Sequence, residues 1–175
     1  MEAPGPKQIQ LSVPPRRPSG PGTAVVSTSC GSFEIELDYA RAPRTASSFA
    51  FLVEEGVYDE TPIHRIEPGF VVQGGDPLGD GTGGPGYFVD EAPPQDLSYT
   101  RGTVAMAKSG AEPPGRSASQ FFVVTAADAG LSPDYALLGR VSSGFDVVKR
   151  IESLGSEGGQ PLAPVVIEAI TLRGP

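Results

Sequence analysis

The chain has 175 residues, a net charge of −8 and a single cysteine, and it contains 23 glycines and 19 prolines. This length fits one domain. The acidic balance and scattered basic residues exclude the positive stripe that binds nucleic acid. Because Cys30 has no second cysteine, a disulfide framework and a cysteine metal cluster are also excluded. No run of 18 apolar residues occurs, so we expect no membrane span.

The first 22 residues are rich in proline and glycine without periodicity. This composition predicts a flexible leader, followed by one domain over residues 23–175. The leader lacks the basic and apolar regions of a signal peptide, so we expect a cytoplasmic protein. A targeting segment removed upstream is the alternative. A single acidic domain with a polar, glycine-rich surface predicts a monomer.

Short apolar runs between turn residues predict an antiparallel strand pattern. The expected strands are Thr23–Ser29, Ser32–Asp38, two segments within 63–76, Thr103–Ala107, Gln120–Thr125, Tyr135–Val141 and Val165–Leu172. Two helices are expected, from Pro43 to Gly56 and from Phe145 to Leu154. Their buried stripes are expected to be Phe49, Leu52 and Val53, and Val147, Val148 and Ile151. Many short strands with two isolated helices favour a mainly β fold, a closed antiparallel barrel capped at its ends; a sandwich is the alternative.

The segment 63–76 combines an arginine, apolar anchors and a glutamine in what reads as two short strands. Side chains two apart share a face of a strand, so we expect Phe70 and Val72 on one face and Val71 and Gln73 on the other. A fixed cation beside an apolar patch, with a neutral amide and no acid–base partner, is poorly suited to hydrolysis. It suits a reaction in which bonds are rotated rather than broken.

Two charged or titratable residues of this segment have competing interpretations. Arg65 either forms a salt bridge to a carboxylate such as Asp76 or Glu91, or presents a fixed fork of donors at a pocket rim. The residues alone leave these two nearly even. His64 is the only histidine, which excludes an ordinary histidine metal site. We expect it to be a barrel residue that hydrogen-bonds locally rather than a catalytic base.

A second informative run begins at Gln120 and continues through the following aromatic strand. Gln120 and Phe122 share one face, while Phe121 and Val123 occupy the other. Phe122 is therefore either a core residue or part of a peptide groove lined by an amide and an aromatic ring. The strand edge over residues 103–110 could pair with an extended peptide through main-chain hydrogen bonds.

The loop Gly79–Gly84 formally matches the G-x-G-x-x-G pattern of dinucleotide sites. Such a site needs a helix that starts at the third glycine and points its N-terminus at phosphate. Pro85 and Gly86 follow instead, so a nucleotide site is disfavoured. A nucleophile elbow of the G-x-S-x-G type is absent.

Taken together, several motifs resemble the cyclophilin family of peptidyl-prolyl cis-trans isomerases, in its single-domain, bacterial-like form. The resemblance covers about residues 23–173 and rests on motifs in family order: His64-Arg65-Ile66, Pro68-Gly69-Phe70, Gln73-Gly74-Gly75-Asp76, Gly81-Thr82-Gly83-Gly84, Met106-Ala107, Ser119-Gln120-Phe121-Phe122 and Leu138-Gly139-Arg140-Val141. It implies an eight-stranded antiparallel β-barrel with two capping α-helices and an open groove on its outer wall. The glycine-rich loop then becomes a turn beside the groove.

The resemblance also implies roles for individual residues. Arg65 becomes the catalytic arginine, and Gln73 holds the substrate backbone. The proline pocket and its walls are implied to be Phe70, Phe122 and Leu131, with Val71 where the family usually has methionine and Tyr135 where many members have histidine. The adjoining subsite is implied to be Ala107, Lys108, Ser109 and Gln120, with Lys108 in place of the commoner asparagine.

Gly130 is the clearest departure from the family pattern, because animal members typically carry a tryptophan there that helps bind cyclosporin. We therefore expect cyclosporin to bind weakly. The expected partners are proline-containing polypeptides, and the reaction requires neither metal nor cofactor.

Uncatalysed rotation about an X-Pro bond is slow because amide resonance gives a barrier of about 18–20 kcal/mol. The leading hypothesis is a prolyl isomerase that assists protein folding. A proline-peptide binding or chaperone module with little turnover is the alternative, motivated by Val71, Lys108 and Gly130. A barrel that binds sugar or another small ligand is disfavoured because the chain lacks tryptophan and clustered groove carboxylates.

Overall fold

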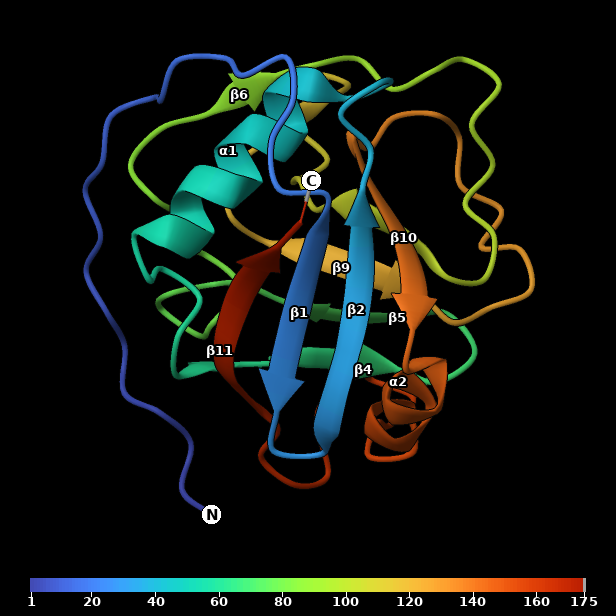
Figure 1. Cartoon of the computed structure of the whole chain (residues 1–175). Helices are drawn as coiled ribbons and strands as arrows, with labels where there is room; N and C mark the ends of the chain where they lie inside the picture. Colours follow the sequence, from blue (N-terminus) through green and yellow to red (C-terminus); the bar gives the residue numbers. More distant parts are fainter. Residues whose placement is uncertain (175) are drawn as a thin grey trace.

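The protein is described here by a computed structural model over residues 1–174, and it consists of short antiparallel strands and two helices (Figure 1). In chain order the elements are β1 (Thr23–Thr28), β2 (Gly31–Leu37), α1 (Pro43–Glu54), β3 (Thr61–Pro62), β4 (Arg65–Glu67), β5 (Val71–Gly74), β6 (Val89–Asp90), β7 (Thr103–Met106), β8 (Arg116–Ser117), β9 (Phe121–Val124), β10 (Leu137–Ser143), α2 (Phe145–Glu152) and β11 (Val166–Arg173).

The main sheet curls around one core. Its strand order is β3-β11-β1-β2-β10-β7-β9-β5-β4, with β6 and β8 paired separately. The two end strands are consecutive in the chain, and only Ile63 and His64 separate them. The amide of Ile63 donates to the carbonyl of Val165 at 2.8 Å, so this short link remains bonded to the sheet. The mainly β prediction is confirmed. The main sheet has nine strands rather than eight because the segment 61–67 is divided at this link.

Strand alternation builds the core inside the sheet. In β2 the side chains of Phe33, Ile35 and Leu37 are buried, while the intervening glutamates face outward. The predicted hairpin between β1 and β2 is present, but it turns at Ser29 and Cys30 rather than at Cys30 and Gly31, because Gly31 already pairs with Thr28. Strands β1 and β2 therefore form a regular antiparallel ladder, which makes one wall of the barrel.

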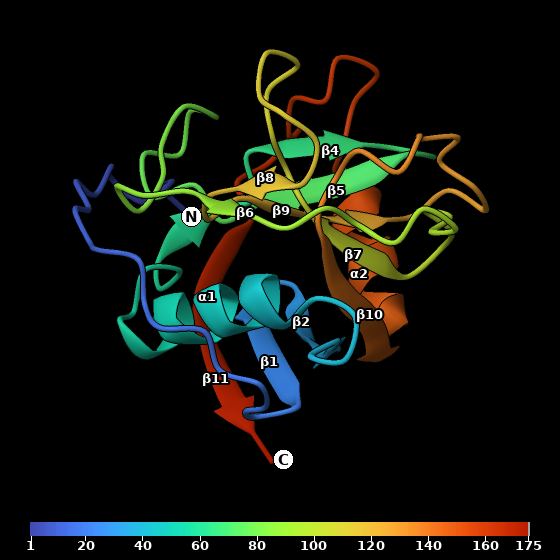
Figure 2. The same ribbon diagram turned by 90° about the horizontal axis from the view of Figure 1, so that it is seen from above.

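The two helices cover opposite ends of the barrel (Figures 1 and 2). Both predicted stripes are confirmed. In α1 the buried apolar stripe includes Phe49, Leu52 and Val53, and in α2 it is Val147, Val148 and Ile151. Gly56 follows the end of α1 with φ of +67°, a conformation that glycine adopts at little cost. Each helix thus closes the core with the face that its periodicity predicts.

Residues 1–22 contain neither helix nor strand and run along the outside of the barrel, in blue in Figure 1. They nevertheless contact the domain. The amides of Lys7 and Leu11 donate to the carbonyls of Pro77 and Pro85 at 2.8 and 2.7 Å. Between residues 1 and 174, no helix is long and apolar enough to cross a membrane.

Candidate active site

A second apolar cluster lies on the outer side of the wall formed by β5, β9 and β7. It is separate from the barrel core because these strands bury side chains on both faces. Its buried members are Val71, Tyr99, Ala105, Phe122 and Val124, and its half-buried members are Phe70, Leu97, Ala107, Ala126, Ala129, Leu131 and Tyr135. The half-buried members leave apolar surface open to solvent, as a site for an apolar ligand group requires.

Strand β9 shows this division residue by residue. Phe121 and Val123 belong to the barrel core, whereas Phe122 and Val124 belong to the outer cluster. The predicted alternation is confirmed. Phe122 is 4% exposed and packs edge-on against Tyr135, with ring centroids 5.5 Å apart. The two interpretations of Phe122 therefore combine, because it is buried within the cluster that borders the groove.

Tyr99 supports this cluster and has no counterpart among the residues expected from the sequence. Its hydroxyl donates to the carbonyl of Tyr135 at 2.7 Å and accepts the amide of the same residue at 3.0 Å. Burial raises the pKa of Tyr99. These bonds fix the segment that carries Tyr135. The available signal was an aromatic residue in a loop without periodicity, which gives no indication of its partner.

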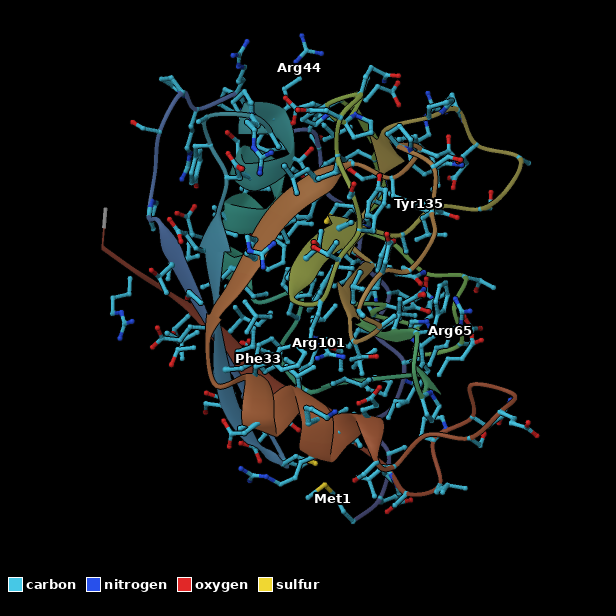
Figure 3. The ribbon with its side chains drawn as sticks, turned by 90° about the vertical axis from the view of Figure 1, so that its right-hand side faces the viewer. Met1, Phe33, Arg44, Arg65, Arg101 and Tyr135 are labelled. Carbon is cyan, nitrogen blue, oxygen red and sulfur yellow. The ribbon has the colours of Figure 1, made fainter. Side chains whose placement is uncertain are left out.

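A row of polar side chains borders the apolar cluster. Arg65 on β4 lies opposite Gln73 on β5, and Gln73 lies opposite Phe122 on β9, so these residues come side by side through strand register. One Nη of Arg65 donates to Oε1 of Gln73 at 3.4 Å, and Nε2 of Gln73 donates to Oε1 of Gln120 at 3.1 Å. Arg65 and Tyr135 lie on the same side of the molecule, at the right in Figure 3.

Arg65 is held at the rim rather than in the core. Its guanidinium carbon is 5.8 Å from the centroid of the Phe70 ring, and its side chain is 43% exposed. Its second Nη is 2.6 Å from Oε2 of Glu67. The remaining N–H groups of the fork are available to a ligand, because Gln73 and Glu67 use only part of it.

The expected salt-bridge partners of Arg65 are wrong. Asp76 is fully buried and accepts the main-chain amides of Leu78 and Gly81, which closes the glycine-rich loop. Glu91 instead accepts the amides of Arg44 and Thr45 at 3.0 and 2.7 Å. It thereby satisfies donors at the start of α1, where no local side chain caps the helix.

The expected orientation of Phe70 is also wrong. Phe70 belongs to the outer cluster together with Val71, whereas alternation placed it with Val72, which faces the core. The reason is that β5 begins at Val71, so Phe70 lies in the preceding turn and its amide donates to the carbonyl of Glu67. Strand periodicity does not apply there. The resulting position agrees with the pocket role that the resemblance implied.

Lys108 does not present its charge to the groove. Its side chain is only 4% exposed, and Nζ lies 2.7 Å from Oδ2 of Asp134. The ammonium also lies 5.3 Å from the centroid of the Tyr135 ring and donates to the carbonyl of Glu112 at 3.2 Å. The neighbouring Ser109 is exposed. Lys108 therefore acts as a packed support of the groove wall.

His64 stands apart from the polar row. Its Nδ1 is buried and has no hydrogen-bond partner among residues 1–174, so the expected local bond is wrong for this nitrogen. Burial lowers the pKa of His64, with the charge of Asp76 acting in the opposite direction. The imidazole is therefore uncharged at neutral pH.

A cavity of about 720 Å³ adjoins the apolar cluster. Gln73, Gln120 and Ala107 line its groove side, and the glycine-rich loop lines another side. Nε2 of Gln120 donates to the carbonyls of Gly81 and Gly83 at 3.0 and 3.1 Å. No helix starts at this loop, so the phosphate interpretation fails and the loop is a turn beside the groove. In the described part of the chain, no three His, Cys, Asp or Glu residues are grouped as a metal site would require.

The chain matches one protein family over most of its length. Residues 23–172 match the family model described as cyclophilin type peptidyl-prolyl cis-trans isomerase/CLD. The chain belongs to the cyclophilin family of peptidyl-prolyl cis-trans isomerases. This cyclophilin is 37% identical over 153 residues to peptidyl-prolyl cis-trans isomerase ppi1 of Schizosaccharomyces pombe, covering 84% of this chain and 97% of the relative. It is 38% identical over 147 residues to CYP18-2 of Arabidopsis thaliana, covering 81% and 87%.

Solved structures agree with this assignment. A cyclophilin-type isomerase of Cryptosporidium parvum, crystallised in the presence of the dipeptide Ala-Pro, has a TM-score of 0.80 and 28% identity to this cyclophilin, covering 87% of this chain and 99% of the other. A second crystal structure of that isomerase also has a TM-score of 0.80, with 31% identity. The predicted isomerase function and the cyclophilin fold are confirmed.

Proposed function

We propose that Arg65 is the catalytic residue of this cyclophilin and that the outer cluster around Phe122 holds the proline ring. The observation that carries the proposal is the register that places Arg65, Gln73 and Phe122 side by side on β4, β5 and β9. A cation with free donors thus borders a half-open apolar surface, and the neighbouring carboxylate of Glu67 is paired with that cation. The substrates are proline-containing polypeptides.

The proposed mechanism follows from amide electronics. In the half-rotated bond, the proline nitrogen becomes pyramidal and its lone pair is no longer delocalised. A donor aimed at this lone pair, or at the proline carbonyl, stabilises the twisted state more than either planar state. Arg65 is placed to be that donor. Lowering the barrier by about 7–8 kcal/mol would accelerate the rotation about 10⁵- to 10⁶-fold.

The other residues bind and orient the substrate. Phe122, Phe70 and Leu131 hold the ring still while the preceding carbonyl swings, and Tyr135 closes the cluster from the side. Gln73 is proposed to hold the substrate backbone beside Arg65. Val71 is 2% exposed, so it forms the floor of this pocket rather than its rim.

The adjoining subsite is proposed to be built by Ala107, Ser109 and Gln120. Ala107 belongs both to the apolar cluster and to the lining of the cavity, so a bound chain could pass from one to the other. Lys108 contributes through its main chain, because its ammonium is engaged by Asp134.

Exchange between the cis and trans peaks of an Ala-Pro peptide in NMR spectra tests this function. The isomerase predicts exchange cross-peaks that appear only when the protein is present at catalytic concentration. A binding or chaperone module predicts chemical-shift changes without added exchange. The second result would contradict turnover in this groove.

We also propose that the protein is a monomer, that it acts in the cytoplasm and that it binds cyclosporin weakly. Gly130 supports the last point, because it lacks the tryptophan side chain of animal members, and a β-carbon at this position would meet no heavy atom within 4 Å. Light scattering at micromolar concentration tests the monomer, cell fractionation tests the compartment, and titration with cyclosporin tests the affinity. A nanomolar dissociation constant would contradict the last proposal.

A further inference from the structure

The leader is fixed against the glycine-rich loop at both ends of that loop. The amide of Lys7 donates to the carbonyl of Pro77, and the amide of Leu11 donates to the carbonyl of Pro85. Nζ of Lys7 donates to the carbonyls of Gly56, at 3.4 Å, and Asp59. The leader therefore follows the loop from one proline to the other.

The segment between these bonds has strand-like alternation. Lys7, Ile9 and Leu11 are half-buried, whereas Gln8 and Gln10 are exposed. Ile9 and Leu11 pack against the barrel core. This alternation orients each side chain, because successive residues of an extended chain point in opposite directions. Apolar burial and two main-chain bonds thus hold residues 7–11 in one position.

A further anchor lies beyond this segment. Both Nη atoms of Arg17 lie 3.0 Å from the carboxylate oxygens of Glu54, and its amide donates to Oγ of Ser47 at 2.9 Å. These contacts attach the leader to α1. The leader is therefore held to the domain over residues 7–11 and again at Arg17.

The leader lines the same cavity as the proposed subsite. Lys7, Gln8 and Ile9 form one wall of the 720 Å³ space, and Gln120 and Ala107 form the wall next to the proline pocket. Pockets that bind ligands typically have volumes of about 300–1,000 Å³. A polypeptide whose proline sits beside Phe122 would extend over Gln120 into this space. The family match begins at residue 23, so this wall belongs to a part of the chain outside the family domain.

We propose that residues 7–9 determine specificity for a residue that flanks the substrate proline; this inference rests on the proposed substrate groove. The charged groups that line the cavity already have partners. Lys7 is bonded to main-chain carbonyls, Lys108 to Asp134, and Glu112 to the amide of Ser109.

Among the described residues of this lining, the side-chain amide of Gln8 and the hydroxyl of Ser109 remain as uncharged donors and acceptors, and the hydroxyl of Thr82, which donates to Oδ1 of Asp80 at 2.6 Å, can still accept a hydrogen bond. A flanking side chain that is polar and uncharged, such as glutamine, fits this lining. A charged flanking side chain would have to compete with these existing bonds to pair with Lys7, Lys108 or Glu112.

Charge substitutions at Gln8 test the proposal. Peptides that are identical except for Gln, Glu or Lys two residues before proline are compared, together with a second series varied two residues after it. Gln8→Arg is expected to raise the ratio of kcat/KM for the Glu peptide over the Lys peptide by about fivefold in one series, as a solvent-exposed ion pair allows. Gln8→Glu is expected to change the same ratio in the opposite direction.

Ser12→Arg is the matched control, because Ser12 is exposed on the same leader and does not line this cavity. It is expected to keep the wild-type ratios. Unchanged ratios for both Gln8 variants, in proteins with wild-type melting temperatures, would overturn the role of the leader. If wild-type protein fails to isomerise a peptide with alanine on both sides of proline, the proposed groove fails instead, so the two failures are distinguishable.

Discussion

Part of the Arg65 guanidinium at the groove rim is paired with Glu67 of the same strand, with one Nη 2.6 Å from Oε2 of Glu67. Alternation could have predicted this pair, because residues two apart on a strand share a face. Asp76 and Glu91 were instead the candidate partners of Arg65 expected from the sequence. Those carboxylates serve the loop and α1, and only the packing of distant segments reveals these roles. Glu67 and Tyr99 are therefore the residues of the site that were not predicted from the sequence.

Glu67→Gln is expected to raise kcat/KM on an Ala-Pro peptide by up to about fivefold. The amide keeps a hydrogen-bond acceptor near Arg65 and removes the negative charge that competes with the substrate. An exposed ion pair contributes about 0–1 kcal/mol, which sets this limit. A coupled or NMR exchange assay at low ionic strength measures the effect.

Glu34→Gln is the control for Glu67→Gln, because Glu34 forms a similar exposed pair with Arg173 at 2.7 Å, on the opposite wall of the barrel. Its kcat/KM should equal that of the wild type. A loss of activity in Glu67→Gln alone would mean that the carboxylate positions Arg65 and does not restrain it.

At the scale of elements, the two faces of β9 have different roles. Its inward side chains stabilise the barrel core, and its outward side chains belong to the proposed proline pocket. Phe121→Ala is expected to cost about 3–5 kcal/mol in the free energy of unfolding, because this ring lies in the barrel core between Phe49 and Tyr58. Phe122→Ala removes a ring from the half-open outer cluster. It should destabilise the fold less and raise the Kd for a proline peptide at least tenfold. Urea unfolding and peptide titration of the two variants give the comparison, and equal effects on both quantities would contradict the two-sided wall.

Most of the elements could be predicted from the sequence because their patterns are local. The hairpin at Cys30, the stripes of both helices and the alternation of β9 follow from residue periodicity. The two-residue strands β3, β6 and β8 could not be predicted, because each exists only through pairing with a distant segment. Phe70 was misplaced for a related reason, since the first residue of a strand depends on its turn.

The lining of the groove could be predicted from the sequence, whereas the contacts of Lys108 and of the leader could not. The apolar and polar sides of the groove follow from the alternation around Gln73 and Phe122, and the structure brings these residues together. The burial of Lys108 against Asp134 does not follow, because lysine is usually exposed and its partner lies in another loop. The contacts of the leader were equally hidden, since a proline- and glycine-rich composition predicts flexibility.

At the scale of the whole molecule, His64 makes stability depend on pH. Burial lowers its pKa in the folded state, whereas the unfolded chain has a pKa of about 6.5. Below that pH the unfolded chain takes up a proton that the folded state resists, so the free energy of unfolding decreases as pH falls. The nearby charges of Asp76 and Asp80 favour the protonated form, and that of Arg65 opposes it.

His64→Gln should therefore lose less stability than the wild type between pH 7.5 and pH 5.5. Urea unfolding at both pH values measures this difference, and the carboxylates act alike in the two proteins. An equal loss in both would show that His64 is not responsible.

The central claim is that Arg65 stabilises the twisted X-Pro bond and not merely the bound peptide. NMR line shapes of an Ala-Pro peptide, recorded with wild type and with Arg65→Ala, give both the interconversion rate on the enzyme and the affinities of the cis and trans forms. We predict that this rate falls about 100- to 1,000-fold, as for loss of one transition-state donor, while both affinities change less than threefold. An unchanged rate on the enzyme, with affinity alone reduced, would contradict the account.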